Sequence, residues 1–238
     1  MVLLNQFENM NWLEIKKYLK KKNSKVIVPI GTMEVHGAHL PIASDVIVPL
    51  ELAKYVATKI NAIIAPPVFY GITRNMMHFV GSLSVSSNSF KIYITDLINS
   101  LIRTGFKTII LINGHGDQKE ELEEVISNVE YKNVKMILIN WYEECKDINK
   151  KIFKSSGGHA AVDETAAILS INPKIVKKKN FKLSHIGYFS ELNKNKKWSL
   201  VMISNRKDKG LPIFNKKLAD KYFSLVKRRI LKIIKDQL

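Results

Sequence analysis

Residues 26–49 read VIVPIGTMEVHGAHLPIASDVIVP, an apolar run followed by a loop that carries acids and histidines. The run at 26–30 predicts a buried strand, and the glycines beyond it permit sharp turns. Glu34 and His36 lie two residues apart, so both side chains can point toward one ion from an extended loop. Carboxylate and imidazole ligands together suit a divalent transition metal. The alternative is a polar loop whose acids and histidines, including His39, are merely solvated.

A second stretch, KTIILINGHGDQ at 107–118, repeats this arrangement with an apolar strand, glycines and then His115 and Asp117. In open α/β sheets ligands bind outside the carboxyl ends of the strands, so both stretches point to that edge. The chain thus offers five candidate metal ligands: Glu34, His36, Asp45, His115 and Asp117. Five ligands exceed the three that one catalytic zinc usually takes, which indicates two ions with Asp45 as the bridge. Asp45 and Asp117 each precede a predicted helix, so a helix cap is the alternative for both.

Apolar periodicity predicts an α/β fold with a mostly parallel central sheet, because predicted helices and strands alternate along the chain. The predicted helices lie at 10–22, 46–60, 90–103, 118–129, 160–170 and 218–238, and further strands at 62–68, 107–112 and 134–140. The long polar segment 70–87 is typical of a binding loop, with Arg74 and His78 as candidates for substrate binding. Trp141 follows the strand at 134–140, where it is either a wall of a small-molecule pocket or an ordinary core residue.

The stretch from Gly31 to Asp45 resembles the signature of the creatininase (creatinine amidohydrolase) family. Three further segments resemble motifs of that family in the same order: Tyr70-Gly71 followed by HFVGSLS at 78–84, Asn113-Gly-His115-Gly, and HAAVDET at 159–165. The matches run from about residue 26 to 170, so the resemblance covers most of the chain.

The resemblance implies a three-layer α/β/α fold formed as one domain over residues 1–238, and a homo-oligomer that is often a hexamer. It also implies two divalent ions, which would be zinc, manganese or iron. The implied ligands of the first ion are Glu34, Asp45 and His115, and those of the second are His36, Asp45 and Asp117. His159 or Glu164 would give the leaving nitrogen its proton if either reaches the site.

Two positions depart from the family pattern. Many members carry Gly-Gly-Asn after Asn-Gly-His and a glutamate as the fourth residue of the last block, whereas this chain has Asp117 and Val162. Valine cannot bind a metal, so an acid is missing from the later block. Asp117 lies two residues beyond His115 on an extended loop and can supply the missing ligand.

The formal charge of +17 at pH 7 raises the question of nucleic-acid binding, since basic patches neutralise phosphates. The lysines are dispersed, at 16–22, 176–182, 194–197, 207–217 and 227–235. Arginines, which base reading favours, are few. We therefore expect a solvated lysine-rich surface, with nucleic-acid binding as the alternative of another class. An anionic substrate is a second use for the charge.

The chain has one cysteine, Cys145, so no intrachain disulfide can form and nothing indicates an oxidising compartment. No stretch approaches the roughly 20 apolar residues of a membrane span. We expect a cytoplasmic protein without a membrane partner.

Two close cations lower the pKa of a water molecule between them, until a bridging hydroxide exists at neutral pH, and polarise a carbonyl oxygen. The sequence therefore predicts a metal-dependent amidohydrolase that cleaves a non-peptide C–N bond in a small cyclic or linear amide. The alternative within the family is a formamidopyrimidine nucleotide deformylase of archaeal flavin and deazaflavin biosynthesis, whose phosphorylated substrate would suit the positive charge.

Overall fold

The fold is built on a parallel sheet, seen in a computed structural model that describes residues 6–128, 133–188, 199–203 and 210–238. The strands are β1 (Lys25–Ile30), β2 (Ile63–Ile64), β3 (Thr108–Asn113) and β4 (Lys135–Asn140), in the spatial order β2-β1-β3-β4. All three strand pairs are parallel, and β1 and β3 pair along their whole length from Lys25–Thr108 to Ile30–Asn113. The carboxyl ends of β1, β3 and β4 therefore lie side by side.

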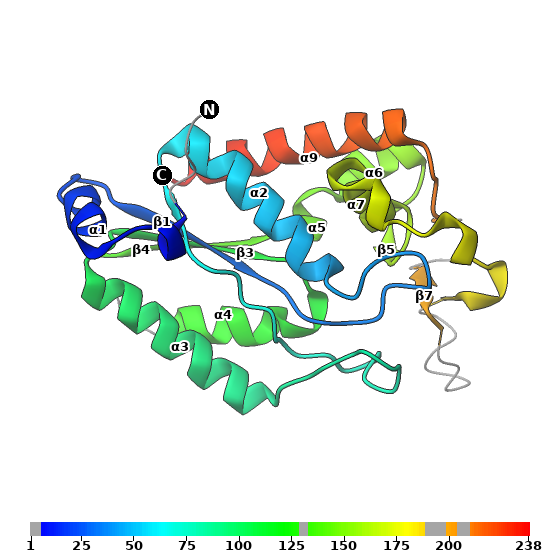
Figure 1. Cartoon of the computed structure of the whole chain (residues 1–238), viewed down its shortest axis with the longest axis horizontal. Helices are drawn as coiled ribbons and strands as arrows, with labels where there is room; N and C mark the ends of the chain where they lie inside the picture. The colour runs from blue at the N-terminus through cyan, green and yellow to red at the C-terminus, as the bar shows by residue number, and fades with distance from the viewer. Residues whose placement is uncertain (1–5, 129–132, 189–198, 204–209) are drawn as a thin grey trace.

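Helices cover both faces of this sheet (Figure 1). One face packs against α2 (Ser44–Ile60), α5 (Trp141–Glu144), α6 (Lys146–Phe153), α7 (Val162–Ile171) and α9 (Lys216–Asp236). The other face packs against α1 (Trp12–Leu19), α3 (Ser87–Thr104) and α4 (Lys119–Asn128). The predicted three-layer α/β/α fold with a parallel central sheet is confirmed.

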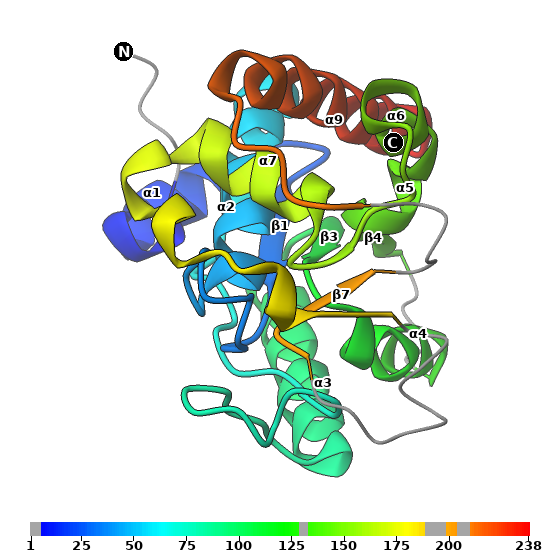
Figure 2. The same cartoon turned by 90° about the vertical axis from the view of Figure 1, so that its right-hand side faces the viewer.

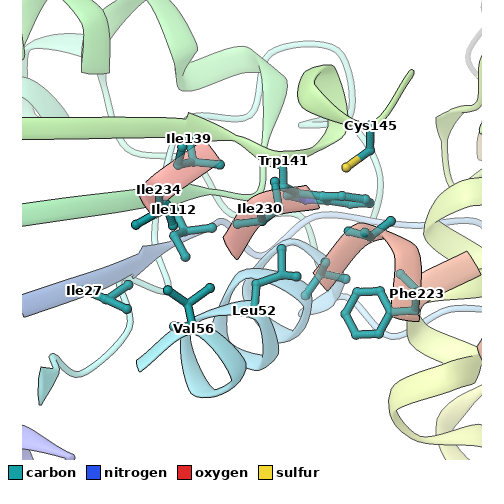
Figure 3. Packing of buried hydrophobic residues seen from close by; sticks show 14 of the residues in the cluster. Ile27, Leu52, Val56, Ile112, Ile139, Trp141, Cys145, Phe223, Ile230 and Ile234 are labelled. Atoms are coloured by element: carbon teal, nitrogen blue, oxygen red, sulfur yellow. The ribbon is translucent and has the colours of Figure 1, made fainter. Parts of the chain in front are cut away.

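The pleat of the strands divides the core into two clusters, because successive side chains point to opposite faces. Ile27, Ile112 and Ile139 pack with α2 and α9 in one cluster (Figure 3). Val28 and Leu111 pack with α3 in the other. Burial on both faces explains why the strands read as continuous apolar runs rather than as alternating ones.

A small second sheet lies beside the main one and was not predicted from the sequence. It consists of β5 (Gly158–His159), β7 (Val201–Ile203) and β6 (Ile186–Tyr188), in the order β5-β7-β6. Figure 2 labels its middle strand, β7. The Gly37 N–H donates to the carbonyl oxygen of Leu200 at 2.8 Å, which ties the sheet to the loop after β1. The small sheet is thereby held against the carboxyl end of the main sheet.

The main elements lie close to their predicted positions, with two exceptions. The strand predicted at 62–68 is reduced to β2 and one bridge at Val68, because Pro66 and Pro67 have no N–H to donate. The helices α5 and α6 were not predicted. The short 3-10 turns are Phe7–Asn9, Gly116–Gln118, Pro173–Ile175, Lys178–Asn180 and Leu183–His185.

Two regions of the sequence interpretation fall wholly or partly beyond the structure. The lysines at 194–197 and the first part of the run at 207–217 lie outside the described residues. Across the part of the chain that is described, no helix is both long and apolar enough to span a bilayer.

Candidate metal centre

The candidate ligands gather where α2 begins against the ends of β1 and β3. Two glycines make this approach possible: a Cβ on Gly31 would lie 2.3 Å, and one on Gly114 would lie 1.9 Å, from the carbonyl oxygen of Asp45. The Gly114 N–H also donates to the Ile30 carbonyl at 2.8 Å, which extends the strand pairing into the loop. Any larger residue at either position would push the first turn of α2, and Asp45 with it, away from the strand ends.

The first group of ligand atoms comes from Glu34, Asp45 and His115, whose donor atoms all lie within 4.8 Å of one another. Nδ1 of His115 is 2.8 Å from Oδ2 of Asp45 and 3.6 Å from Oε2 of Glu34. All three side chains are buried. The first motif, the helix that follows it and the turn after β3 each contribute one of them.

The second group consists of His36, Asp45 and Glu164. Nε2 of His36 lies 3.0 Å from Oδ1 of Asp45 and 3.4 Å from Oε2 of Glu164. The other ring nitrogen, Nδ1, is 3.0 Å from the Glu34 carbonyl oxygen. It donates to that oxygen in the tautomer in which Nε2 is unprotonated and keeps its lone pair. The two oxygens of Asp45 therefore face different groups.

His159 lies next to both groups on strand β5. Its Nε2 is 2.7 Å from the carbonyl oxygen of Val35, and its Nδ1 is 3.4 Å from Oε2 of Glu34. With a proton on Nε2, the ring donates to Val35 and turns the lone pair of Nδ1 toward the cluster. A third candidate ligand group, formed by Glu34, His36 and His159, overlaps the first two.

Buried charges shift the pKa values of these groups strongly. Burial alone would lower the pKa of His36, but Asp45 and Glu164 raise it to about 10, and Glu34 and Asp45 likewise raise the pKa of His115 to about 9. Burial raises the pKa of Glu34 to about 7 and that of Glu164 to about 8. Burial opposes the charge of Asp45 too, but His36 and His115 hold its pKa well below its usual range.

The donor set fits divalent metal ions. Nε2 of His36 and Oδ2 of Asp45 are buried without a hydrogen-bond partner among the described residues, although an oppositely charged atom lies near each. Atoms that lie close together without hydrogen-bond geometry are arranged as ligands of a common ion would be. Three carboxylates and three imidazoles also match the hard and borderline ligands that zinc and manganese take.

Asp117, predicted as a ligand of the second ion, lies beside the cluster rather than in either group. Its Oδ2 accepts the backbone N–H of Arg74 at 2.7 Å and is 3.8 Å from Nε2 of His115. It lies in the 3-10 turn before α4, where it joins the loop after β2 to the end of β3. In this structure Glu164 occupies the place beside His36 that the resemblance implied for Asp117.

The three predicted substrate-binding residues lie outside the cavity at the cluster. Trp141 is 1% exposed and packs in the core (Figure 3), because β4 runs directly into α5 and directs the indole toward α9. The Arg74 guanidinium donates to Glu121 at 2.5 Å, and His78 is exposed on the same loop. Trp141 is therefore an ordinary core residue, which was the alternative considered for it.

Asn113, at the end of β3, holds the turn that carries His115. Its Nδ2 donates to the His115 carbonyl and to Oδ1 of Asn140, both at 2.8 Å. Its Oδ1 accepts the His115 N–H at 3.1 Å and Nε2–H of Gln118 at 2.8 Å. All four hydrogen-bonding positions of this buried amide are used, so the turn is fixed independently of any ion.

His39, from the first motif, serves the fold rather than the cluster. Its Nε2 lies 2.9 Å from Oγ1 of Thr165, and its ring packs edge-on against Phe181 and Phe214. This contact links the loop after β1 to α7, the helix that carries Glu164. Burial lowers the pKa of His39 to about 4, so the ring is neutral.

A cavity of about 260 Å³ opens onto the cluster. Glu34, His115, His159 and Glu164 line it, together with residues that the sequence interpretation did not single out, including Asn75, Lys146, Ser156 and Asp163. Asp163 is buried and accepts N–H bonds from Gly158 at 3.1 Å and Asn149 at 3.2 Å. The sequence signal that could have identified Asp163 was its acidic side chain within the HAAVDET block.

Comparisons with known proteins agree with this geometry. The chain is 30% identical over 187 residues to 3-dehydro-scyllo-inosose hydrolase of Thermotoga maritima, covering 71% of this chain and 57% of that protein. It is 30% identical over 156 residues to 2-amino-5-formylamino-6-ribosylaminopyrimidin-4(3H)-one 5'-monophosphate deformylase of Methanosphaera stadtmanae, covering 64% of this chain and 62% of that protein. The chain thus spans about three fifths of the length of these curated relatives.

A solved structure of a manganese creatininase superposes with a TM-score of 0.78 at 19% identity, covering 98% of both chains. A sequence model of the creatininase family, described as creatinine amidohydrolase, matches residues 8–207. That match takes in the strands β1 to β4, every candidate ligand and the block that begins at His159. The chain therefore belongs to the creatininase family.

Proposed function

We propose that this protein is a metal-dependent amidohydrolase that cleaves a non-peptide C–N bond in a small cyclic or linear amide. The observation that carries the proposal is the position of Asp45. One of its oxygens faces His115 at 2.8 Å and the other faces His36 at 3.0 Å, so one carboxylate belongs to two ligand groups. A shared carboxylate of this kind is what two adjacent ions require.

The residues present would hold two divalent ions. Glu34, Asp45 and His115 would hold the first, and His36, Asp45 and Glu164 the second. When bound, such ions supply Lewis acidity toward a carbonyl oxygen and a water nucleophile at neutral pH. Glu164 is the proposed acid of the second set because its Oε2, which also accepts the Ala160 N–H at 2.6 Å, is 3.4 Å from Nε2 of His36, whereas Asp117 belongs to none of the ligand groups.

His159 is the proposed proton carrier. Burial and the nearby charge of His36 hold its pKa well below the usual value, so the imidazole is neutral and Nδ1 carries a lone pair. The bond from Nε2–H to the Val35 carbonyl fixes the ring orientation. A ring at the cavity wall can then pass the proton to the departing nitrogen, which needs one to leave as an amine.

The size of the cavity supports a small substrate. A space of about 260 Å³ lies just below the range of about 300–1,000 Å³ that is usual for small-molecule sites. Met76 and Met202 give it apolar walls, while the ligand groups lie among its polar lining residues. The relatives act on different compounds by name, so membership of the family does not by itself specify the substrate.

The second candidate function is that of a formamidopyrimidine nucleotide deformylase. The specific observation in its favour is the 30% identity to the deformylase of Methanosphaera stadtmanae. The net charge of +17 suits a phosphorylated substrate. Both functions use the same hydrolysis of an amide and differ in the group that the cavity must accept.

Other features stay predictions: two ions rather than one, zinc, manganese or iron as their identity, one domain, a homo-oligomer with six subunits as the family state, and a cytoplasmic location. The test of the function is metal analysis of the purified protein, followed by a screen of cyclic amides, formamides and formamidopyrimidine nucleotides for released amine or formate. Metal-dependent hydrolysis of one class is expected. Metal-loaded protein that hydrolyses none of them would contradict the proposal.

A further inference from the structure

A lysine lies in the wall of the cavity. Lys146 is the first residue of α6, and of the residues that line the cavity, all within the described part of the chain, it is the one Lys or Arg side chain. Its side chain is 58% exposed, as expected for a residue near the cavity mouth. Of the ligand groups, Glu34, His36, Asp45 and His115 are buried, and His159 and Glu164 are only partly exposed.

The ammonium group of Lys146 is weakly paired. Its contact with Oε1 of Glu143 is 3.8 Å long, whereas the other oxygen of Glu143 binds Nζ of Lys119 at 2.8 Å. The charge of Glu143 is thus already shared with Lys119. An exposed pair at 3.8 Å contributes little, so Lys146 can exchange it for an anion in the cavity at small cost.

The acids that share the cavity wall with Lys146 already have other partners. Asp117 accepts the backbone N–H of Arg74, and Asp163 accepts the backbone N–H of Gly158 and a side-chain N–H of Asn149. Glu34 and Glu164 belong to the ligand groups. Lys146 therefore lacks a close acidic partner in the wall, and the neighbouring Asn75 and Ser156 add polar side chains to the same lining.

We propose that the substrate carries an anionic group, a carboxylate or a phosphate, and that Lys146 binds it while the amide lies at the ligand groups. This inference rests on the proposed amidohydrolase function and specifies its substrate class. A lysine ammonium is a compact point charge that binds either group, and charge-assisted hydrogen bonds are among the stronger ones. Lys146 is then a specificity residue, distinct from those that carry out the hydrolysis.

The test uses two pairs of probes that differ in one charged group. N-formylglycine is compared with N-formylglycinamide, and the phosphate ester of N-formylethanolamine with N-formylethanolamine itself. The metal-loaded wild-type protein, Lys146→Gln and the control Lys150→Gln are assayed for kcat/KM by formate release and for Kd by calorimetry. Lys150 lies on the same helix, is exposed and does not line the cavity.

Lys146→Gln should weaken binding of one or both anionic probes by roughly tenfold, and lower their kcat/KM similarly, while leaving the neutral probes unchanged. The affected pair identifies the group as carboxylate or phosphate. Lys150→Gln should change none of the four values. Raising the salt concentration should narrow the gap between wild type and Lys146→Gln.

Any of three results with the variants would overturn the inference: equal losses for charged and neutral probes, no loss for any probe, or the same loss in Lys150→Gln. If the protein binds the probes but hydrolyses none of them, the proposed function fails while the Kd values still decide the role of Lys146. Failure of the wild-type protein to bind any anionic probe more tightly than its neutral partner also overturns it. Unchanged metal content in Lys146→Gln verifies that the ligand groups are intact.

Discussion

The turn after β3 and the entrance to α7 each bring a histidine and an acid to the same cluster, but they hold the pair differently. In the turn, His115 faces Asp45 while Asp117 points away to the Arg74 N–H. At the entrance to α7, Glu164 faces His36, and His159 lies beside Glu34. The spacing of two residues favoured Asp117 as the ligand, whereas the structure has Glu164 nearer to His36, because an extended loop and a helical first turn direct side chains differently.

The difference lies in what each region anchors. The turn after β3 continues a central strand, and Asp117 uses its carboxylate to hold the neighbouring loop. The entrance to α7 is a helix start, where a carboxylate is favoured by the helix dipole and can still face the cluster. A helix start can thus support an acid and present it to the cluster at the same time.

The largest effect is expected for Asp45, which the two regions share. Asp45→Asn should lower amide hydrolysis by more than about a thousandfold, because a neutral amide bridges two cations poorly. Turnover and bound metal, measured on a variant with an unchanged circular dichroism spectrum, check this. Near-wild-type values of both would make Asp45 a helix residue only.

Glu164→Gln and Asp117→Asn separate the two regions directly. Glu164→Gln should lower the affinity for one of the two ions by more than the roughly 10- to 100-fold that the loss of an outer partner costs. Asp117→Asn should change it far less, because an amide oxygen can still accept the Arg74 N–H. Metal titration of both variants under one condition is decisive. The reverse order would restore Asp117 as the ligand.

The pH dependence of metal uptake tests whether His36 and His115 are protonated when no ion is bound. With pKa values raised to about 10 and 9, His36 and His115 carry protons at neutral pH that an ion must displace. Affinity should therefore rise with pH between 6 and 8, by about tenfold per unit for each ion that displaces one proton. Calorimetry in buffers of different ionisation enthalpy counts the released protons. Uptake without proton release would contradict these protonation states.

Asp163→Asn probes the entrance to α7 without touching a ligand. The new amide would present an N–H to the Gly158 or Asn149 donor, so the segment before His159 should shift and kcat should fall by about tenfold. Metal content should stay at the wild-type level. If metal is lost together with activity, Asp163 acts through the ligand groups instead.

The smallest effect is expected on α9, at the half-buried Lys227 and the exposed Arg228, neither of which belongs to a ligand group or lines the cavity. Lys227→Gln and Arg228→Gln should leave hydrolysis of an uncharged amide within about twofold, because surface charge is screened beyond about 10 Å at moderate salt. Arg229 differs, since it binds Asp147 at 2.7 Å, and its loss should cost about 0.5 kcal/mol of stability. A large loss of turnover in the first two variants would show that α9 contributes to the site.

The sequence predicted most of the fold because its strands are buried on both faces and read as unbroken apolar runs. It also proposed as ligands Glu34, His36 and His115, which lie in short loops after strands, and Asp45, which lies in the first turn of α2, and the structure brings these four candidates together. It did not predict β5, β6 and β7, since strands of two or three residues carry no periodicity. Lys146 and Asp163 were missed because contacts between distant segments, not local spacing, bring them to the cavity.

Asn113 has a consequence for how quickly the candidate metal centre would take up an ion. The Asn113 amide uses both of its donor and both of its acceptor positions. The His115 backbone therefore has no alternative arrangement. Little conformational entropy would then be lost when an ion arrives, so association should be limited by desolvation of the incoming cation rather than by ordering of the turn. By this reasoning Asn113→Ala would bind metal slowly even where the final complex forms.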